Sequence, residues 1–552
     1  WAWLMPIHLR AVDASVLQRA GRNTPGLIDR GLRLVGEKKS GAAELLWRAA
    51  QEEKTPGREK LRSALENLSK ENPQLQILGA ADSRLENFLN LPTTPTSLRN
   101  QKSPLSAEEE KNGTNSAFEV QSFTRFVVQS ENREKAITLL RGSTHPAVQE
   151  LLRCVELTNT VLFPSSLSSS GQAFDTALSI GGLLLDGQHL TPPLTDALFV
   201  RAAAALRGEN SQPLEQMLLD FMFLGQRFNW GQLVAFVEQI ENPETLRLHA
   251  NLLRKADAPV PTIFSAVQLS GNPAGVAKYL MKFSQTGQKD LSWSLRFGAG
   301  AVNELLKRDQ RLHFSRFNRA VAVDLCWQES WFALTVKWLL FLLAGFMLAV
   351  GLHIARPATS PLEPRIQATG LYVAREILFA FGFLLVVLLL GEPFLAQEKQ
   401  NVEFPIRLQL PTVSKAVPAG NVAVTTTIMN QLSLLTLLLF FVLQALIYTA
   451  CLIKLAEIRR QEFPSRVKLK LLDNEEHLFD AGLYLGFAGT IISLIMVSMG
   501  VIKPSLMAAY SSTSFGIIFV SIFKIFHLRP LRRKLLLEAE AASVLSDSPD
   551  VL

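Results

Sequence analysis

Ala481–Ile502 (AGLYLGFAGTIISLIMVSMGVI) and Ser505–Phe523 (SLMAAYSSTSFGIIFVSIF) are two uncharged apolar stretches near the end of the chain, and they decide its fold. A helix needs about 20 predominantly apolar residues to cross a bilayer, and each stretch is long enough. Only Lys503 and Pro504 separate the two stretches. We therefore expect a tight hairpin of two membrane helices.

Small residues recur along both stretches at helical spacing. Steps of four, three and four residues link Gly482, Gly486, Gly489 and Ser493 in the first stretch, and Ser505, Ala509, Ser512 and Gly516 in the second. Small residues in line let membrane helices approach closely, so we expect packing faces at Gly482, Gly486, Gly489, Ala509 and Gly516. This pattern on its own is compatible with packing alone.

Hydroxyl side chains give the hairpin a second, functional interpretation. Buried hydroxyls can line a hydrated path through a helix bundle, and the candidates here are Thr490, Ser493, Ser512 and Thr513. The same side chains can instead bond back to a carbonyl one turn earlier in their own helix. The residues alone leave both interpretations open.

Three further apolar segments precede the hairpin, at 332–353, 371–390 and 432–453. They bring the prediction to five spans in a membrane domain that covers residues 331–552. Lys337 lies near one end of the first span, where a long basic side chain can reach the interface. The fold class that we expect is all-α: a helical-array extracytoplasmic domain followed by a polytopic α-helical membrane domain.

Basic residues predict the orientation of the spans. They follow the third span (Lys454, Arg459, Arg460, Arg466, Lys468, Lys470) and the fifth span (Arg529, Arg532, Arg533, Lys534). The positive-inside rule places both groups in the cytoplasm. Residues 391–430 and the N-terminal domain then lie outside, which in a bacterium with two membranes is the periplasm. The expected location is a bacterial inner membrane.

The first 330 residues have the pattern of helices outside a membrane. We expect a helical segment over 1–92, a polar linker over 93–116, and an α-solenoid-like domain over 117–330 in which helices repeatedly begin at proline. A compact irregular helical domain is the alternative for that last segment. Trp1–Pro6 has the composition of the interfacial end of a membrane helix, or of a processed soluble start.

Composition and motifs exclude several function classes. Of the 552 residues, 48% are apolar and 19% charged, and much of the basic excess behind the +7 net charge stands beside apolar spans, so it does not indicate nucleic-acid binding. There is no HExxH, P-loop, GxGxxG or GxSxG motif, and we expect no catalytic residue, metal or cofactor. Cys154 and Cys326 could pair in an oxidising compartment or stay buried thiols.

Two motifs in the hairpin resemble the MotA/TolQ/ExbB proton-channel family. Leu485–Thr490 (LGFAGT) is similar to the opening of that family's second helix, and Pro504–Gly516 (PSLMAAYSSTSFG) to the start of its third. Thr490 and Thr513 fall on the family's two threonine positions. Ala508 stands where the ExbB and TolQ branches usually have Glu, and Ser493 replaces a usual glycine.

The resemblance implies a homo-oligomer, a pentamer, around a dimeric partner of the ExbD/TolR type. Each partner chain would have a single membrane helix that carries an essential Asp, and proton flow through that Asp would drive work on the cell envelope. Thr490 and Thr513 would then face the ion path. From the residues, the alternative is a membrane-anchored protein that binds or scaffolds a periplasmic partner and conducts no ions. Neither hypothesis makes the chain an enzyme.

Overall fold

Most of the chain that the structure describes is helical, which confirms the predicted helical class. The structure is a computed structural model, and it describes residues 2–72, 75–82, 85, 122–154, 172–255, 257–315, 320–355, 369–394, 431–498 and 506–546. Within these ranges the only strands are β1 (Ala11–Asp13) and β2 (Arg311–His313), which pair with each other. The predicted linker 93–116 lies outside the described residues.

The chain divides into two compact units, one of residues 12–315 and one that combines residues 1–11 with residues 316–552. The described helices of the first unit are α1 (Ala14–Gly21), α2 (Leu27–Gly36), α3 (Ser40–Glu52), α4 (Arg58–Glu71), α5 (Leu75–Leu78), α7 (Phe123–Val128), α8 (Ser130–Arg141), α9 (Pro146–Arg153), α10 (Gln172–Asp186), α11 (Pro192–Leu206), α12 (Gln212–Arg227), α13 (Trp230–Val237), α14 (Pro243–Arg254), α15 (Val260–Ser270), α16 (Pro273–Leu295) and α17 (Ala299–Arg308).

Proline and asparagine set many of the helix starts in this unit. Proline occupies the first or second position of α11, α12, α14 and α16, as the sequence predicts. A missing N–H costs nothing there, because the first N–H groups of a helix have no partner within it. Asn242 and Asn272 cap α14 and α16, where each side-chain oxygen accepts a hydrogen bond from a backbone N–H of the first turn.

Helices from the two ends of the unit pack against each other. Contacts join α1 to α17, and α3 to both α13 and α15. Gly300 lies so close to α1 that an added Cβ atom would overlap the Ala20 carbonyl oxygen. The segments on either side of the predicted linker therefore belong to one unit, in which Cys154 is a buried free thiol.

A chain of ionisable side chains joins four segments of this unit. His189 lies 3.7 Å from both Asp82 Oδ2 and Glu238 Oε1, and Glu238 in turn accepts from Lys39 Nζ at 2.7 Å. Trp230 Nε1 donates to Asp82 at 3.0 Å. Burial by itself would lower the pKa of His189, but the two carboxylates outweigh it and raise the pKa to about 8.

We expect the substitution His189→Gln to destabilise the protein more at about pH 6 than at about pH 9.5. A histidine whose pKa is raised in the folded state contributes its full stability below its ordinary pKa of 6.5, and loses it as the pH rises through about 8. Thermal unfolding of both proteins across this range measures the effect. A difference in Tm that stays constant with pH would contradict the ion-pair role.

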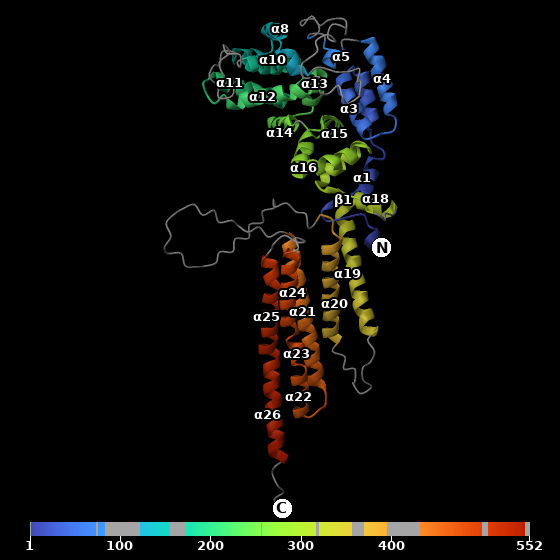
Figure 1. The fold of residues 1–552 in the computed structure, drawn as a ribbon, viewed down its shortest axis with the longest axis vertical. Helices are drawn as coiled ribbons and strands as arrows, with labels where there is room; N and C mark the ends of the chain where they lie inside the picture. Colours follow the sequence, from blue (N-terminus) through green and yellow to red (C-terminus); the bar gives the residue numbers. More distant parts are fainter. Residues whose placement is uncertain are drawn as a thin grey trace, which may run out of the picture. The chain divides into compact units, whose positions relative to one another are not determined.

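The second unit contains the apolar helices. Its elements are η1 (Ala2–Leu4), α18 (Ala320–Gln328), α19 (Ser330–Ala355), α20 (Thr369–Gly391), α21 (Gln431–Arg460), α22 (Ser465–Asn474), α23 (Glu476–Phe479), α24 (Ala481–Ser498), α25 (Leu506–Phe523), η6 (Lys524–Leu528) and α26 (Arg529–Ser546). Within the unit, α19, α21 and α25 run in one direction, and α20 and α24 run in the other (Figure 1).

Four helices of this unit are long and apolar enough to cross a membrane. They are Ser330–Ala355, Gly370–Gly391, Leu434–Arg460 and Tyr510–Ala541, which correspond to the first, second, third and fifth predicted spans. The fourth predicted span, 481–502, is represented by α24, whose apolar stretch Ala481–Ile492 is shorter. Residues 499–505, which include the predicted turn of the hairpin, lie outside the described residues. The chain is thus a helical protein of the membrane-embedded type.

The start of the chain packs on α19 and α20. Lys337, buried near the start of α19, donates to the carbonyl oxygen of Ile7. The backbone N–H of Leu9 donates to Glu392 Oε2 at 2.9 Å, just after the end of α20. Burial raises the pKa of Glu392, and its hydrogen bond from Leu9 opposes that shift. Residues before β1 therefore tie the first two spans together.

Candidate functional site

Glycines bring the backbones of α24 and α25 into direct contact. A Cβ atom on Gly486 would lie 2.8 Å from the carbonyl oxygen of Ser512, and one on Gly516 would lie 2.7 Å from the carbonyl oxygen of Gly482. These distances are too short for any side chain, so only glycine allows the observed approach. The stripes of small residues in the sequence thus face each other across the hairpin.

The close approach places two threonine hydroxyls together. Thr490 Oγ1 and Thr513 Oγ1 lie 2.5 Å apart. Both also approach the carbonyl oxygen of Gly486, Thr490 at 3.1 Å and Thr513 at 3.3 Å. Thr490 is buried and Thr513 is half-buried, so the pair is enclosed on the side of α24 and more open on the side of α25.

The Gly486 carbonyl limits how the pair can share its protons. Each threonine hydroxyl donates once and has two acceptor positions. One hydroxyl can therefore donate to Gly486 while the other donates to its neighbour, and the two can exchange these roles. In either arrangement at least one acceptor position remains on the pair. Thr513 can donate its proton elsewhere while Thr490 keeps its hydrogen bond to the Gly486 carbonyl.

Of the other two hydroxyls predicted to line the path, the structure describes the side chain of Ser512 but not that of Ser493. Ser512 is 1% exposed, and its hydroxyl lies against Gly489, where an added Cβ atom would be 2.5 Å away. Ser493 lies in α24 and Ala509 in α25, but their side chains are outside the described residues. Thr490, Ser512 and Thr513 are thus the predicted hydroxyls that the structure brings to one interface.

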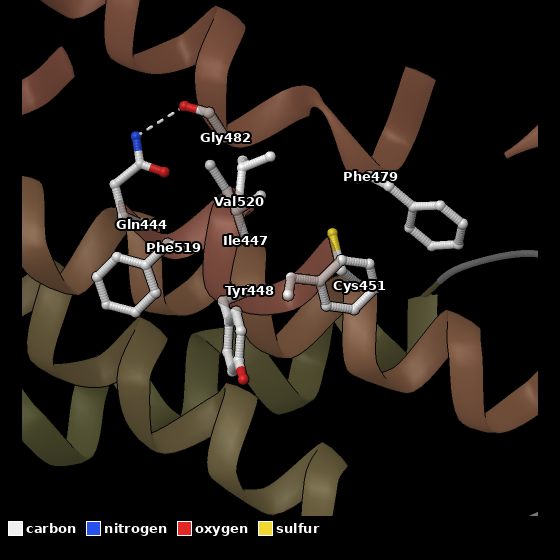
Figure 2. A pocket seen from close by; sticks show the side chains of 9 residues that line it. Gln444, Ile447, Tyr448, Cys451, Phe479, Gly482, Phe519 and Val520 are labelled. Carbon is white, nitrogen blue, oxygen red and sulfur yellow. Dashed lines mark hydrogen bonds between the residues drawn. The ribbon is translucent and has the colours of Figure 1, made fainter. Parts of the chain in front are cut away.

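Gln444 on α21 makes a polar contact with α24 that the sequence did not predict. Its Nε2 donates to the carbonyl oxygen of Gly482 at 3.0 Å, and the residue is 2% exposed (Figure 2). A buried amide in a membrane bundle is costly unless it is bonded, so this contact fixes α21 against the start of α24. The available signal was a lone glutamine within the apolar run 432–453.

A small cavity beside Gln444 is too small to hold a solute. Its volume is about 10 Å³, at the lower limit for a single water molecule. The lining side chains are mostly apolar (Figure 2): Gln444, Ile447, Tyr448, Cys451, Phe479, Gly482, Phe519, Val520 and Phe523. This part of the bundle is therefore a packed interface and not a binding pocket.

Charged and polar contacts hold the same helices beyond the apolar stretch. Lys524 pairs with Asp480 at 2.7 Å, at the point where α25 passes through the π-helical turn η6 into α26. Tyr448 and His527 share a hydrogen bond of 2.9 Å. Asp480 belongs to an acidic cluster before α24, yet no group of metal-ligating side chains is found in the described part of the chain.

Comparison with known proteins identifies no relative of this chain. No family model, characterised protein or solved structure matches the chain. The likeness of residues 485–490 and 504–516 to the MotA/TolQ/ExbB family thus stays a prediction from the sequence, and residues 504 and 505 lie outside the described part.

We expect Gly486→Ala to lower the free energy of unfolding of the membrane unit by about 1–3 kcal/mol, the usual cost of overpacking. The added methyl group would press on the Ser512 carbonyl. Heating the detergent-solubilised protein with a thiol reagent measures the effect, with Cys154 and Cys326 replaced by Ser so that only buried Cys451 reports.

Gly351→Ala is the matched control for this experiment. Gly351 lies in α19, and a Cβ atom there would meet nothing within 4 Å. Its replacement by alanine should leave Cys451 protected to the same temperature. Equal loss of protection in both variants would show that the glycines of α24 are not a close-packed interface.

Proposed function

We propose that this chain is a proton-channel-like subunit of an inner-membrane complex that couples ion flow to work in the cell envelope. In this proposal the hairpin α24–α25 and the helix α21 belong to a homo-oligomer, a pentamer by resemblance to the MotA/TolQ/ExbB family. The oligomer surrounds single-span partner chains of the ExbD/TolR type. The observation that carries the proposal is the pair of touching hydroxyls of Thr490 and Thr513 within an apolar bundle.

A threonine pair suits a carboxylate that gains and loses a proton. Thr513 can donate to an ionised carboxylate while Thr490 keeps its bond to the Gly486 carbonyl. When the carboxylate is protonated, the same hydroxyl can accept from it instead. Both states of a proton-carrying group would thus be supported where water is scarce.

In this proposal the carboxylate comes from another chain. The predicted third, fourth and fifth spans contain no Asp or Glu. An ionisable group within the membrane is costly and is functional by default. A partner helix with one Asp, held in the oligomer beside Thr513, would supply it.

The proposed orientation places the basic segments 454–480 and 529–534 in the cytoplasm. The unit of residues 12–315 is then extracytoplasmic, where its helical array would bind the component on which the complex acts. In α25, η6 and α26 one helical path runs from the hydroxyl pair to the basic tail. Movement at the ion path could reach the cytoplasmic end along this path.

The same geometry also favours a second function, that of a membrane-anchored scaffold. Both hydroxyls already approach the Gly486 carbonyl, so the hairpin needs no partner to satisfy them. A membrane-anchored scaffold, in which α19–α25 only hold the helical unit at the membrane, would have the same contacts. Ion flux separates the two functions.

We expect the double variant Thr490→Val, Thr513→Val to assemble normally and to lose proton flux. A hydrogen bond to a charged group contributes about 1.5–3 kcal/mol, so flux should fall about tenfold or more. The measurement uses the complex purified from native membranes through a tag on this chain and reconstituted in liposomes with a pH-sensitive dye.

Thr449→Val is the control for removal of a buried membrane hydroxyl. Thr449 lies in α21, and its hydroxyl donates to the carbonyl of Ala445 in its own helix at 2.8 Å, so flux should survive its loss. Flux that persists in the double variant would remove the threonine pair from the mechanism. If the wild-type complex carries no flux, the scaffold function holds instead.

A further inference from the structure

A cavity in the unit of residues 12–315 is lined by two arginines. Its volume is about 160 Å³, and it lies between the first turns of α2 and the end of α15. The lining residues are Pro25, Arg30, Arg33, Gln268 and Leu269. This space holds several water molecules, and no carboxylate lines it.

Arg30 is held in place but is not fully hydrogen-bonded. One terminal nitrogen donates to Gln268 Oε1 at 3.1 Å, and Gln268 Nε2 donates onward to the Ala235 carbonyl at 2.6 Å. The Nε atom of Arg30 is buried and has no hydrogen-bond partner. The bond to Gln268 holds the guanidinium group of Arg30 at the wall of the cavity.

Arg33 adds a second positive charge to the same cavity. It lies three residues after Arg30, on the same face of α2, and it is exposed. The nearest acid along the helix, Asp29, uses Oδ2 to accept from the Gly26 N–H at 3.0 Å. Among the described residues, neither arginine of the cavity forms a salt bridge within 4.0 Å.

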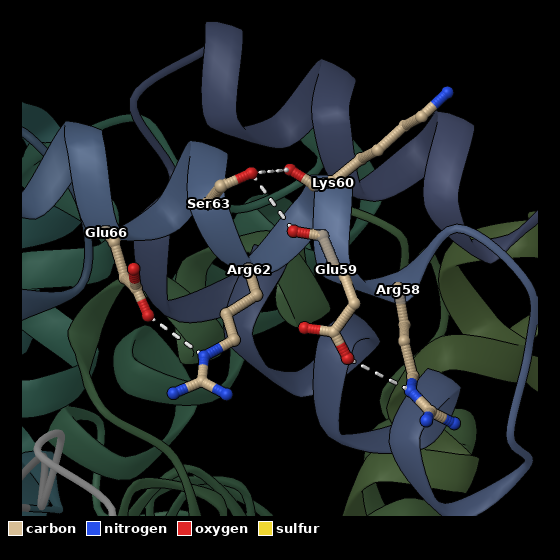
Figure 3. A network of polar contacts seen from close by, with 6 residues as sticks. All are labelled: Arg58, Glu59, Lys60, Arg62, Ser63 and Glu66. Carbon is tan, nitrogen blue, oxygen red and sulfur yellow. Dashed lines mark hydrogen bonds and ion pairs between the residues drawn. The ribbon is translucent and has the colours of Figure 1, made fainter.

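Two exposed arginines on α4 have carboxylate partners. On α4, Arg58 pairs with Glu59 at 3.3 Å and Arg62 pairs with Glu66 at 2.9 Å (Figure 3). The charge of each of these arginines is balanced by its neighbour. Arg30 and Arg33 line one cavity and have no salt bridge within 4.0 Å among the described residues.

We infer that this cavity binds a compact oxyanion of two negative charges, a phosphate group. Guanidinium groups present a planar fork of N–H donors that matches phosphate oxygens, and such charge-assisted bonds are about twice as strong as neutral ones. Arg30 would donate to one oxygen and Arg33 to another. The inference concerns residues 12–315 alone and does not depend on ion conduction by the membrane unit.

The test is calorimetric titration of the full-length protein in detergent with inorganic phosphate, at constant ionic strength. We expect saturable binding that sulfate displaces and chloride does not. Arg33→Gln, at an exposed position, should weaken binding about tenfold without changing the melting temperature, since one charge-assisted bond contributes about 1.5–3 kcal/mol. Arg30→Gln should weaken it at least as much.

Arg62→Gln is the matched control, because Arg62 is exposed but already paired, and it should leave phosphate affinity unchanged. A parallel titration with glycerol 3-phosphate distinguishes a free phosphate from a phosphomonoester as the bound species. Absence of saturable phosphate binding in the wild type would overturn the inference. So would equal affinity in the Arg33→Gln variant, or an equal loss in the Arg62→Gln control.

Discussion

The membrane unit depends on one constraint: the backbones of α24 and α25 touch. Lipid chains are as apolar as leucine, so membrane helices gain little from apolar side chains and associate instead through close packing. Gly486 and Gly516 remove every side-chain atom from the contact. At that separation, the short threonine side chains can reach across the interface and meet.

The neighbouring helix is held to the hairpin by contacts at two levels. Within the apolar region, Gln444 Nε2 donates to the Gly482 carbonyl, which fixes the register of α21 against α24. Beyond it, Cys451, Phe479 and Phe523 form part of a buried cluster, and Lys524 pairs with Asp480. Polar contacts at both levels oppose sliding of the helices along one another. They therefore keep Thr490 and Thr513 at the same level of the bundle.

Local sequence patterns predict the elements of this fold better than its contacts. Hydropathy locates the spans, and proline locates several helix starts in residues 12–315, because both are properties of one segment. The steps of Gly482, Gly486 and Gly489 also predict a packing face. Which residue each glycine meets depends on how two helices are aligned, and no periodicity within one helix contains that information.

The contacts that the sequence did not predict join distant segments. Arg30 and Gln268 are separated by 238 positions, and α1 packs on α17 from the opposite end of the unit. Gln444 was visible as the single amide in its span, but its acceptor is a backbone carbonyl, and every residue has one. Polar side chains in apolar runs are thus the signal to follow, while their partners require the structure.

The most direct test of the central claim is a disulfide between the two threonine positions. In a chain whose three cysteines are replaced by alanine, Thr490→Cys and Thr513→Cys should form an intramolecular disulfide on mild oxidation in native membranes, because the present oxygens lie 2.5 Å apart. Cyanogen bromide cleavage between the two positions, at Met496, Met499 and Met507, would then leave the two cysteine-containing fragments joined. Fragments that separate without reduction, or that join only between different chains, would contradict the close-packed hairpin.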